Sequence, residues 1–170
     1  MPPAYSMMHT CFAPIADGHS RILILGSLPG PQSLASGEYY KNPSNHFWRL
    51  IYALHGHTPA QGYSDKCAFL LKNKLALWDV FCTARREGAS DSAIHDETPN
   101  DFVSFLAEHT KISGIVFNGG KAALGFKKAA PELLVRLPHE TVWSTSGACA
   151  RSFSQKMENW SAALERLGYL

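Results

Sequence analysis

The chain has 170 residues, of which 45% are hydrophobic and 18% are charged, with a formal net charge of +2 at pH 7. These values exclude a disordered chain or a coiled coil, and the charge permits a nucleic-acid partner without requiring one. The length is that of one domain, which we expect to span residues 1–170. No apolar run approaches the roughly 20 residues that span a bilayer, so we expect a cytoplasmic protein. The four cysteines form no Cys-x-x-Cys pair, so we expect reduced thiols and no metal site.

The first predicted elements are a strand and a helix joined by a long loop. A Pro-containing lead-in of about twenty residues precedes residues 21–26, a short apolar run ending in glycine that is typical of a buried parallel strand. A loop with two prolines follows over residues 27–33 and continues to about residue 45. Residues 46–57 carry apolar side chains at helical spacing, which predicts a helix with one face against the sheet.

The rest of the chain continues the alternation of strands and helices. The polar segment 83–100 follows a strand, and we interpret it as a functional loop. In chain order, the predicted elements are a strand at 75–78, a helix from 101 to about 109, a strand at 112–117, a helix over 121–130 ended by Pro131, a strand at 141–143 and a helix over 153–167.

This alternation predicts the fold class. Strands separated by helices favour an α/β fold, here a three-layer α/β/α arrangement around a central four-stranded parallel sheet. Ligand sites in such folds gather at the carboxyl ends of the strands. The unusual loops of this chain follow predicted strands, so we expect them to form one site.

Two segments in the first third of the chain carry a resemblance to a known family. Residues 26–30 are Gly-Ser-Leu-Pro-Gly, and residues 38–48 are Glu-Tyr-Tyr-Lys-Asn-Pro-Ser-Asn-His-Phe-Trp. They resemble the first motif of the uracil-DNA glycosylase superfamily, most closely its family 6 branch of hypoxanthine-DNA or DNA-deoxyinosine glycosylases. Similarity in order and spacing continues over nearly the whole chain after residue 20, at residues 77–80, 88–94, 99–102, 118–122 and 144–146.

The resemblance implies the fold of that superfamily and a monofunctional DNA glycosylase. Such an enzyme acts without a cofactor, as a monomer, on double- or single-stranded DNA that contains a deaminated base. The resemblance suggests hypoxanthine, with uracil and xanthine as alternatives. The base is flipped out of the helix. Because the sugar becomes oxocarbenium-like, the site needs only to hold a water and stabilise the departing base, and an amide oxygen suffices to orient that water.

Asn45 is the candidate catalytic residue. The first motif offers neither a carboxylate nor an amide at Ser27 and Leu28, where many superfamily members carry Asp or Asn nearby. In the family 6 branch, which the chain resembles, the role belongs to the Asn before His-Phe-Trp, which is Asn45 here. The alternative is that Asn45 caps the helix that follows it.

The resemblance also implies a base pocket. Tyr40 occupies the position of an aromatic residue that stacks on the flipped base, a contact worth about 1–3 kcal/mol, and Tyr39 is its competitor. Asp79 stands where relatives carry an amide that recognises the pairing edge of the base; alternatively it is a structural carboxylate bonded to loop amides. Three further residues belong to the pocket: Gly26, Ser27 and Leu28.

The second motif of the superfamily, a loop that contacts DNA, corresponds to residues 144–151. It lacks the prolines that are common in this branch, which predicts a looser loop, and it offers small hydroxyls and amides for phosphates. Arg151 either fills the gap left by the base or is a solvated residue. The candidate DNA contacts are Ser33, Gly119, Lys121, Ser144, Thr145, Ser146 and Arg151.

Two other function classes remain as alternatives. A serine hydrolase triad could use Ser27, or the Ser-Thr-Ser of residues 144–146, with one of eight histidines, but the chain has no Gly-x-Ser-x-Gly segment. A non-catalytic DNA-binding module could keep the glycosylase fold without cutting. The altered second motif favours this module, whereas the presence of Asn45, Tyr40 and Asp79 favours the enzyme.

Overall fold

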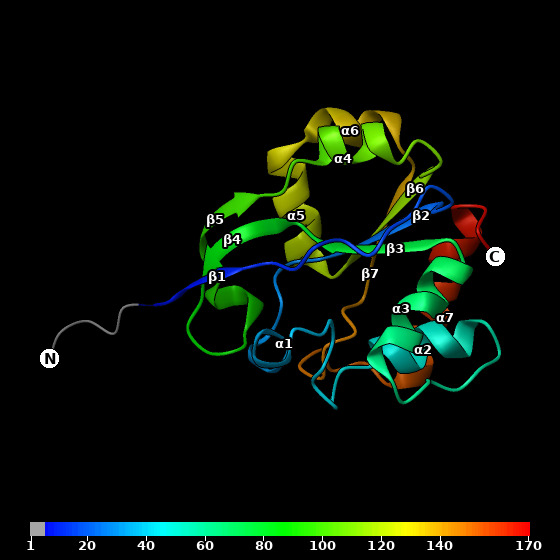
Figure 1. The fold of residues 1–170 in the computed structure, drawn as a ribbon, viewed down its shortest axis with the longest axis horizontal. Coiled ribbons are helices and arrows are strands. Elements are labelled where there is room, and N and C mark those ends of the chain that lie inside the picture. The colour runs from blue at the N-terminus through cyan, green and yellow to red at the C-terminus, as the bar shows by residue number, and fades with distance from the viewer. Residues whose placement is uncertain (1–5) are drawn as a thin grey trace, which may run out of the picture.

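Four parallel strands form the central sheet of the computed structural model, which describes residues 6–170. Residues 1–5, where the expected lead-in and domain begin, lie outside the described residues. All neighbouring strands of this sheet run parallel, so the predicted four-stranded parallel sheet is confirmed. Their order is β3 (Leu75–Asp79), β2 (Ile22–Gly26), β6 (Gly114–Asn118) and β7 (His139–Val142) (Figure 1).

Side chains of the central strand β2 pack alternately on the two faces of the sheet. Leu23 and Leu25 belong to one hydrophobic cluster, and Ile22 and Ile24 belong to the other. The alternation follows from the two-residue period of a strand. Because both faces are covered, every residue of β2 is buried, which explains the continuous apolar run in the sequence.

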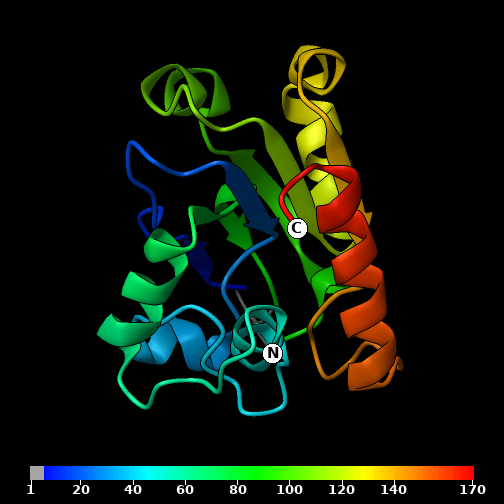
Figure 2. The same ribbon diagram turned by 90° about the vertical axis from the view of Figure 1, so that its right-hand side faces the viewer.

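Helices cover each face of the sheet, and the predicted three-layer α/β/α arrangement is confirmed (Figures 1 and 2). One layer buries Phe102 and Phe126 against the Leu23 side, and the other buries Phe47 and Trp160 against the Ile22 side. The first layer contains α4 (Phe102–Glu108), α5 (Gly120–Ala129) and α6 (Pro131–Arg136). The second contains α2 (Phe47–Leu54), α3 (Tyr63–Lys72) and α7 (Phe153–Arg166). The predicted strands and helices are present, with ends shifted by a few residues.

A second, antiparallel sheet shows that the interpretation of residues 83–100 as a loop is wrong for most of that segment. This sheet has the order β1-β4-β5. Side chains of β5 are exposed or half-buried, so the sequence shows no apolar alternation there. Its elements are β1 (Met8–Thr10), β4 (Phe81–Arg85) and β5 (His95–Pro99), with the short helix η1 (Asp91–Ala93) between β4 and β5.

Besides η1, three α-helices within residues 6–170 were not predicted from the sequence. Helix α1 (Pro31–Ser36) lies inside the segment assigned to a loop, and Pro31 is its first residue. Helix α3 fully buries only Leu70, so its apolar face is too narrow to give a clear pattern. Pro131 ends α5 as predicted and also begins α6, because proline is favoured at the first position of a helix.

Gly125 allows α5 to lie close to the β3–β4 region, and we expect Gly125→Ala to destabilise the protein. A Cβ at this position would be 2.5 Å from Cζ of Phe81 and 3.1 Å from Cγ1 of Val80. Such overpacking costs about 1–3 kcal/mol, measurable as a lower free energy of unfolding in urea. Gly120→Ala in the same helix is the control, because a Cβ there meets nothing within 4 Å. Equal stability of the two variants would contradict this packing.

Candidate active site

A pocket of about 410 Å³ lies at the carboxyl ends of the parallel strands. The ends of β2, β3 and β6 contribute Gly26, Asp79 and Asn118, which stand on adjacent strands. This is the position expected for a ligand site in a parallel α/β sheet. Loops complete the wall, with Ser27, Leu28, Pro29, Ser33, Tyr40, Asn42, Ser44, Asn45, Arg86, Asp91, Ser144 and Ser146 among the lining residues.

Most of the residues predicted from the sequence meet in this pocket. Gly26, Asp79 and Tyr40 are in mutual contact range, because a Cβ on Gly26 would lie 2.7 Å from Oδ1 of Asp79 and 2.9 Å from the hydroxyl of Tyr40. Only glycine therefore fits at this position without displacing one of the two side chains. The other predicted residues that line the pocket are Ser27, Leu28, Ser33, Asn45, Ser144 and Ser146.

Asp79 presents a buried carboxyl group to the pocket. Its relative exposure is 4%, and its Oδ2 has no hydrogen-bond partner among the described residues. Burial first, and then the charge of Asp91, raise the pKa of Asp79 to about 7 against the opposing effect of the Arg86 guanidinium. The predicted alternative, a carboxylate bonded to loop amides, is not what the structure shows, because no such bond to Asp79 is formed.

The structure separates the roles of the two neighbouring tyrosines. The ring of Tyr39 packs in the core, with its hydroxyl donating to the carbonyl oxygen of Ala13 at 3.0 Å. The ring of Tyr40 stacks on Phe47 with centroids 4.1 Å apart, and its hydroxyl accepts from Nδ2 of Asn118 at 3.0 Å. Burial raises the pKa of the Tyr40 hydroxyl, which therefore stays protonated. Tyr40 is thus the tyrosine whose hydroxyl is directed to the strand ends.

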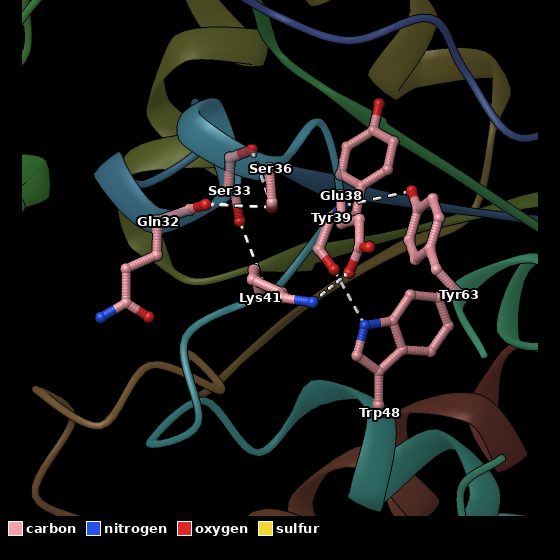
Figure 3. A network of polar contacts seen from close by, with 8 residues as sticks. All are labelled: Gln32, Ser33, Ser36, Glu38, Tyr39, Lys41, Trp48 and Tyr63. Carbon is pink, nitrogen blue, oxygen red and sulfur yellow. Dashed lines mark hydrogen bonds and ion pairs between the residues drawn. The ribbon is translucent and has the colours of Figure 1, made fainter. Parts of the chain in front are cut away.

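The backbone at Tyr40 is strained, with φ of 53°, a left-handed conformation that is uncommon for a bulky residue. Hydrogen bonds from neighbouring segments hold this turn, as Figure 3 shows. The indole of Trp48 donates to the carbonyl oxygen of Tyr39 at 2.9 Å, and the amide of Lys41 donates to Oγ of Ser33 at 3.1 Å. Ser33, a predicted DNA contact, is 5% exposed and is already engaged in this turn.

Asn45 makes the cap-like contact that the sequence allowed as an alternative. Its Oδ1 accepts from the amide of Phe47 at 2.9 Å, close to the start of α2. The side chain is half-buried and also lines the pocket. Since an amide oxygen has two lone pairs, this contact fixes the side chain and leaves one lone pair for a water in the pocket. Positioning and capping are compatible in this geometry.

Asn118 is a site residue that the sequence reasoning missed. Its Nδ2 donates to the hydroxyls of Tyr40 and Thr145, both at 3.0 Å, and its Oδ1 accepts from the amide of Thr145 at 2.9 Å. It therefore joins the first-motif turn to the loop after β7. The signal was available, because Asn118 ends a predicted strand next to two glycines, as Asp79 ends another. Thr145 is fully buried, so its side chain holds the loop rather than facing outward.

Buried contacts also hold the loop over residues 143–151, which was expected to be loose. The amide of His46 donates to the carbonyl oxygen of Thr145 at 2.8 Å. Lys156 of α7 is fully buried and donates from Nζ to the carbonyl oxygen of Ser146 at 2.9 Å, and burial lowers the pKa of this ammonium. The missing prolines are therefore replaced by tethers from α2 and α7.

This loop packs closely against the segment that carries Asn45, and we expect Gly147→Ala to separate them. A Cβ on Gly147 would lie 2.6 Å from Oγ and 2.9 Å from Cβ of Ser44. A displacement of about 1 Å beside the reacting groups can cost roughly 100-fold in rate, so the base release that the sequence resemblance implies should slow by at least tenfold in a single turnover. Adding Ser44→Gly removes the two closest atoms, leaves only the carbonyl oxygen of residue 44 at 3.1 Å, and should restore much of the rate. No rescue by the double variant would mean that the two loops do not act together.

Four predicted DNA contacts lie outside the pocket: the buried Thr145, and Gly119, Lys121 and Arg151. Lys121 forms an ion pair with Glu97 at 3.4 Å. Gly119 is buried with φ of 100°, a conformation that requires glycine, and a Cβ there would be 3.3 Å from Cβ of Ser144. Arg151 is exposed and lies over the ring of Trp143, 4.2 Å from its centroid. Contacts of these residues with DNA stay predictions.

Arg86 was also missed, because in the sequence it stands in a polar run that is typical of a solvated surface. It follows β4 and lines the pocket with 4% relative exposure. Its Nη2 donates to the carbonyl oxygen of Pro29 at 2.6 Å. Nearby, the hydroxyl of Ser27 donates to Oδ1 of Asp91 at 2.9 Å. The pocket therefore contains one buried guanidinium beside two carboxyl groups.

Within residues 6–170, no three His, Cys, Asp or Glu side chains gather as they would around a metal ion. No helix in this part of the chain has the length and apolar character to cross a membrane.

Comparison with known proteins identifies the family. The family model described as "Uracil DNA glycosylase superfamily" matches residues 13–166. A protein named "Hypoxanthine DNA glycosylase" from Methanosarcina acetivorans is 38% identical over 159 residues, covering 92% of this chain and 98% of that protein. A protein of the same name from Methanosarcina barkeri is 35% identical over 158 residues, covering 91% and 97%.

A solved structure agrees with this match. It is a solution NMR structure from Methanosarcina acetivorans, described as a candidate uracil DNA glycosylase. It superposes with a TM-score of 0.82 at 35% identity and covers 95% of this chain and 99% of that one. The family model, the two relatives and the shared fold lead to one conclusion: the chain belongs to the uracil DNA glycosylase superfamily.

Proposed function

We propose that this protein is a monofunctional DNA glycosylase that flips a deaminated base out of DNA and releases it by hydrolysis, with hypoxanthine as its preferred substrate and uracil as a second one. The observation that carries the proposal is the pocket in which Asn45, Tyr40 and Asp79 meet at the strand ends. The names of the two Methanosarcina relatives support hypoxanthine as the base.

In the proposed reaction, a water held by Oδ1 of Asn45 attacks the anomeric carbon of the flipped nucleotide. The bond from carbon to the base nitrogen breaks, the water oxygen forms a new bond to that carbon, and its proton passes to the departing base. Tyr40 contacts the base in the pocket, and Asp79, when ionised, accepts from the N1–H of hypoxanthine. Preorganised dipoles in a site that excludes bulk water supply most of the stabilisation.

The DNA contacts of the proposal come from the loop after β7. Ser144 and Ser146 line the pocket beside the Asn45 segment, where the phosphates of a flipped nucleotide would pass. We propose that the protein acts as a monomer in the cytoplasm on double- or single-stranded DNA. Its four free cysteines fit a reducing compartment, and its size fits superfamily members that act alone.

The proposal is tested by base release from matched duplexes that carry one hypoxanthine, uracil or xanthine, alongside the same strands left single. We expect free hypoxanthine to be released fastest and an abasic site to remain, with strand breaks only after treatment with alkali. Tight binding without release of any base would replace the enzyme by the non-catalytic DNA-binding module. Release of uracil alone would correct the substrate and keep the reaction.

A further inference from the structure

Asp79, at the end of β3, and Arg86, directly after β4, line the same pocket and are equally buried, with 4% relative exposure each. Among residues 6–170, neither Oδ2 of Asp79 nor Nε of Arg86 has a hydrogen-bond partner. Buried polar atoms are almost always paired, and an exception in a pocket marks a place for a ligand. Two residues that line the pocket therefore each have an unpartnered polar atom, an acceptor on Asp79 and a donor on Arg86.

The guanidinium of Arg86 is held in a fixed orientation. Its Nη2 donates to the carbonyl oxygen of Pro29 at 2.6 Å, in the loop between β2 and α1. Because the guanidinium is a planar, rigid fork, anchoring one nitrogen sets the direction of the others. Arg86 can thus act as a preorganised donor toward the pocket without losing freedom when a ligand binds.

A donor and an acceptor that line the same pocket complement the –NH–C(=O)– edge of a deaminated base. Hypoxanthine presents N1–H as a donor and O6 as an acceptor on neighbouring atoms. Adenine presents the opposite pattern, with a lone pair on N1 and an amino group on C6. Deamination of adenine therefore reverses hydrogen-bonding polarity at the two positions that such a pair of side chains would contact.

We infer that Arg86 determines the specificity for the deaminated base by donating to O6 of hypoxanthine while Asp79 accepts from N1–H. This inference rests on the proposed function and extends it to the atoms that deamination changes. Adenine in the same position would place its amino group against the guanidinium and its N1 lone pair against the carboxylate. Two contacts of like polarity in a buried site reject the undamaged base.

The test measures binding without catalysis, using duplexes in which the target nucleotide carries a 2′-fluoroarabino sugar that resists hydrolysis. The wild type is expected to bind hypoxanthine roughly 10- to 100-fold more tightly than 6-thiohypoxanthine, because sulfur keeps N1–H but is a weak acceptor for a charged donor. Arg86→Gln should bring the two affinities together and should also reduce discrimination against adenine. Arg86→Lys, which retains the charge without the fork, should keep a smaller difference.

Arg85→Gln is the matched control. Arg85 is the neighbouring residue and is half-exposed, with its Nε 3.8 Å from Oδ2 of Asp96 on β5. Its replacement should therefore leave the ratio of the affinities for hypoxanthine and 6-thiohypoxanthine unchanged. Equal binding of the two bases by the wild type would overturn the inference, and this result needs no variant to fold. A ratio that is the same in Arg86→Gln as in the wild type would also overturn it.

Hydrolysis of an ordinary hypoxanthine duplex, measured in parallel, separates the inference from the proposed function. Absence of release with the oxygen preference intact would count against the glycosylase reaction and leave the role of Arg86 standing. Normal release of hypoxanthine, with equal affinities for hypoxanthine and 6-thiohypoxanthine, would count against the role of Arg86 and leave the glycosylase reaction standing.

Discussion

Asn45→Ala is expected to lower single-turnover release of hypoxanthine by about 100-fold or more, while the affinity for the substrate duplex changes by only a few-fold. The expected loss is large because the variant removes the acceptor that places water at the anomeric carbon, and misplaced reactants lose the advantage of a preorganised site. The measurement is the rate of base release with enzyme in excess, together with the dissociation constant for an uncleavable duplex.

Two variants separate water positioning from helix capping. Asn45→Ser keeps a residue that accepts from the amide of Phe47 and caps helices well, but its shorter side chain should not hold the water, so folding is retained and the rate stays low. Asn42→Ala changes a second pocket asparagine whose Oδ1 already accepts from the amide of Ser44, and it should leave the rate nearly unchanged. Full activity of Asn45→Ser would mean that Asn45 is a cap only.

Asp79→Asn is expected to remove most of the pH dependence of stability between pH 4 and pH 7. Burial raises the pKa of Asp79 to about 7, so over this interval the folded protein retains a proton that the unfolded chain has released. The stabilisation is complete below the unfolded pKa and is lost as the pH rises through the folded pKa. The contribution of Asp79 to the free energy of unfolding should therefore fall by about 3 kcal/mol over the interval.

The measurement is urea denaturation of both proteins from pH 4 to pH 8. The variant should show a much flatter profile and exceed the wild type in stability above pH 7, because a neutral amide carries no buried charge. Base release by the wild type should rise through pH 7 as the carboxylate that accepts from N1–H forms. Asp65→Asn, a change to an exposed acid on α3, should reproduce none of this. Parallel profiles for wild type and Asp79→Asn would contradict a buried carboxyl at this position.

Much of the fold could be predicted because burial leaves a regular pattern in the sequence. The continuous apolar run of β2 and the helical spacing in α2 follow directly from the two covered faces of the sheet. The antiparallel sheet could not be predicted in this way. Its edge strand β5 faces outward along most of its length, so its pairing with β4 leaves no apolar period.

The candidate site was predictable where a residue ends a strand or belongs to the first motif, as for Gly26, Tyr40 and Asp79. Arg86 was not, because its burial depends on β4 crossing near Pro29, a contact between residues far apart in the chain. The choice between Tyr39 and Tyr40 was also open in the sequence. It is decided by a local backbone conformation that the surrounding hydrogen bonds impose on Tyr40.

The position of β2 in the middle of the parallel sheet has a consequence for folding during synthesis on the ribosome. Strand β6, one of the two neighbours of β2, follows it by about 90 residues in the chain. At a synthesis rate of about 5–20 residues per second, the apolar strand β2 therefore remains unpaired on that edge for roughly 5–20 s. Contacts of such long range also slow folding. We therefore expect nascent chains to engage holdase chaperones until β6 has emerged, and the pocket to form only in the last stage of folding.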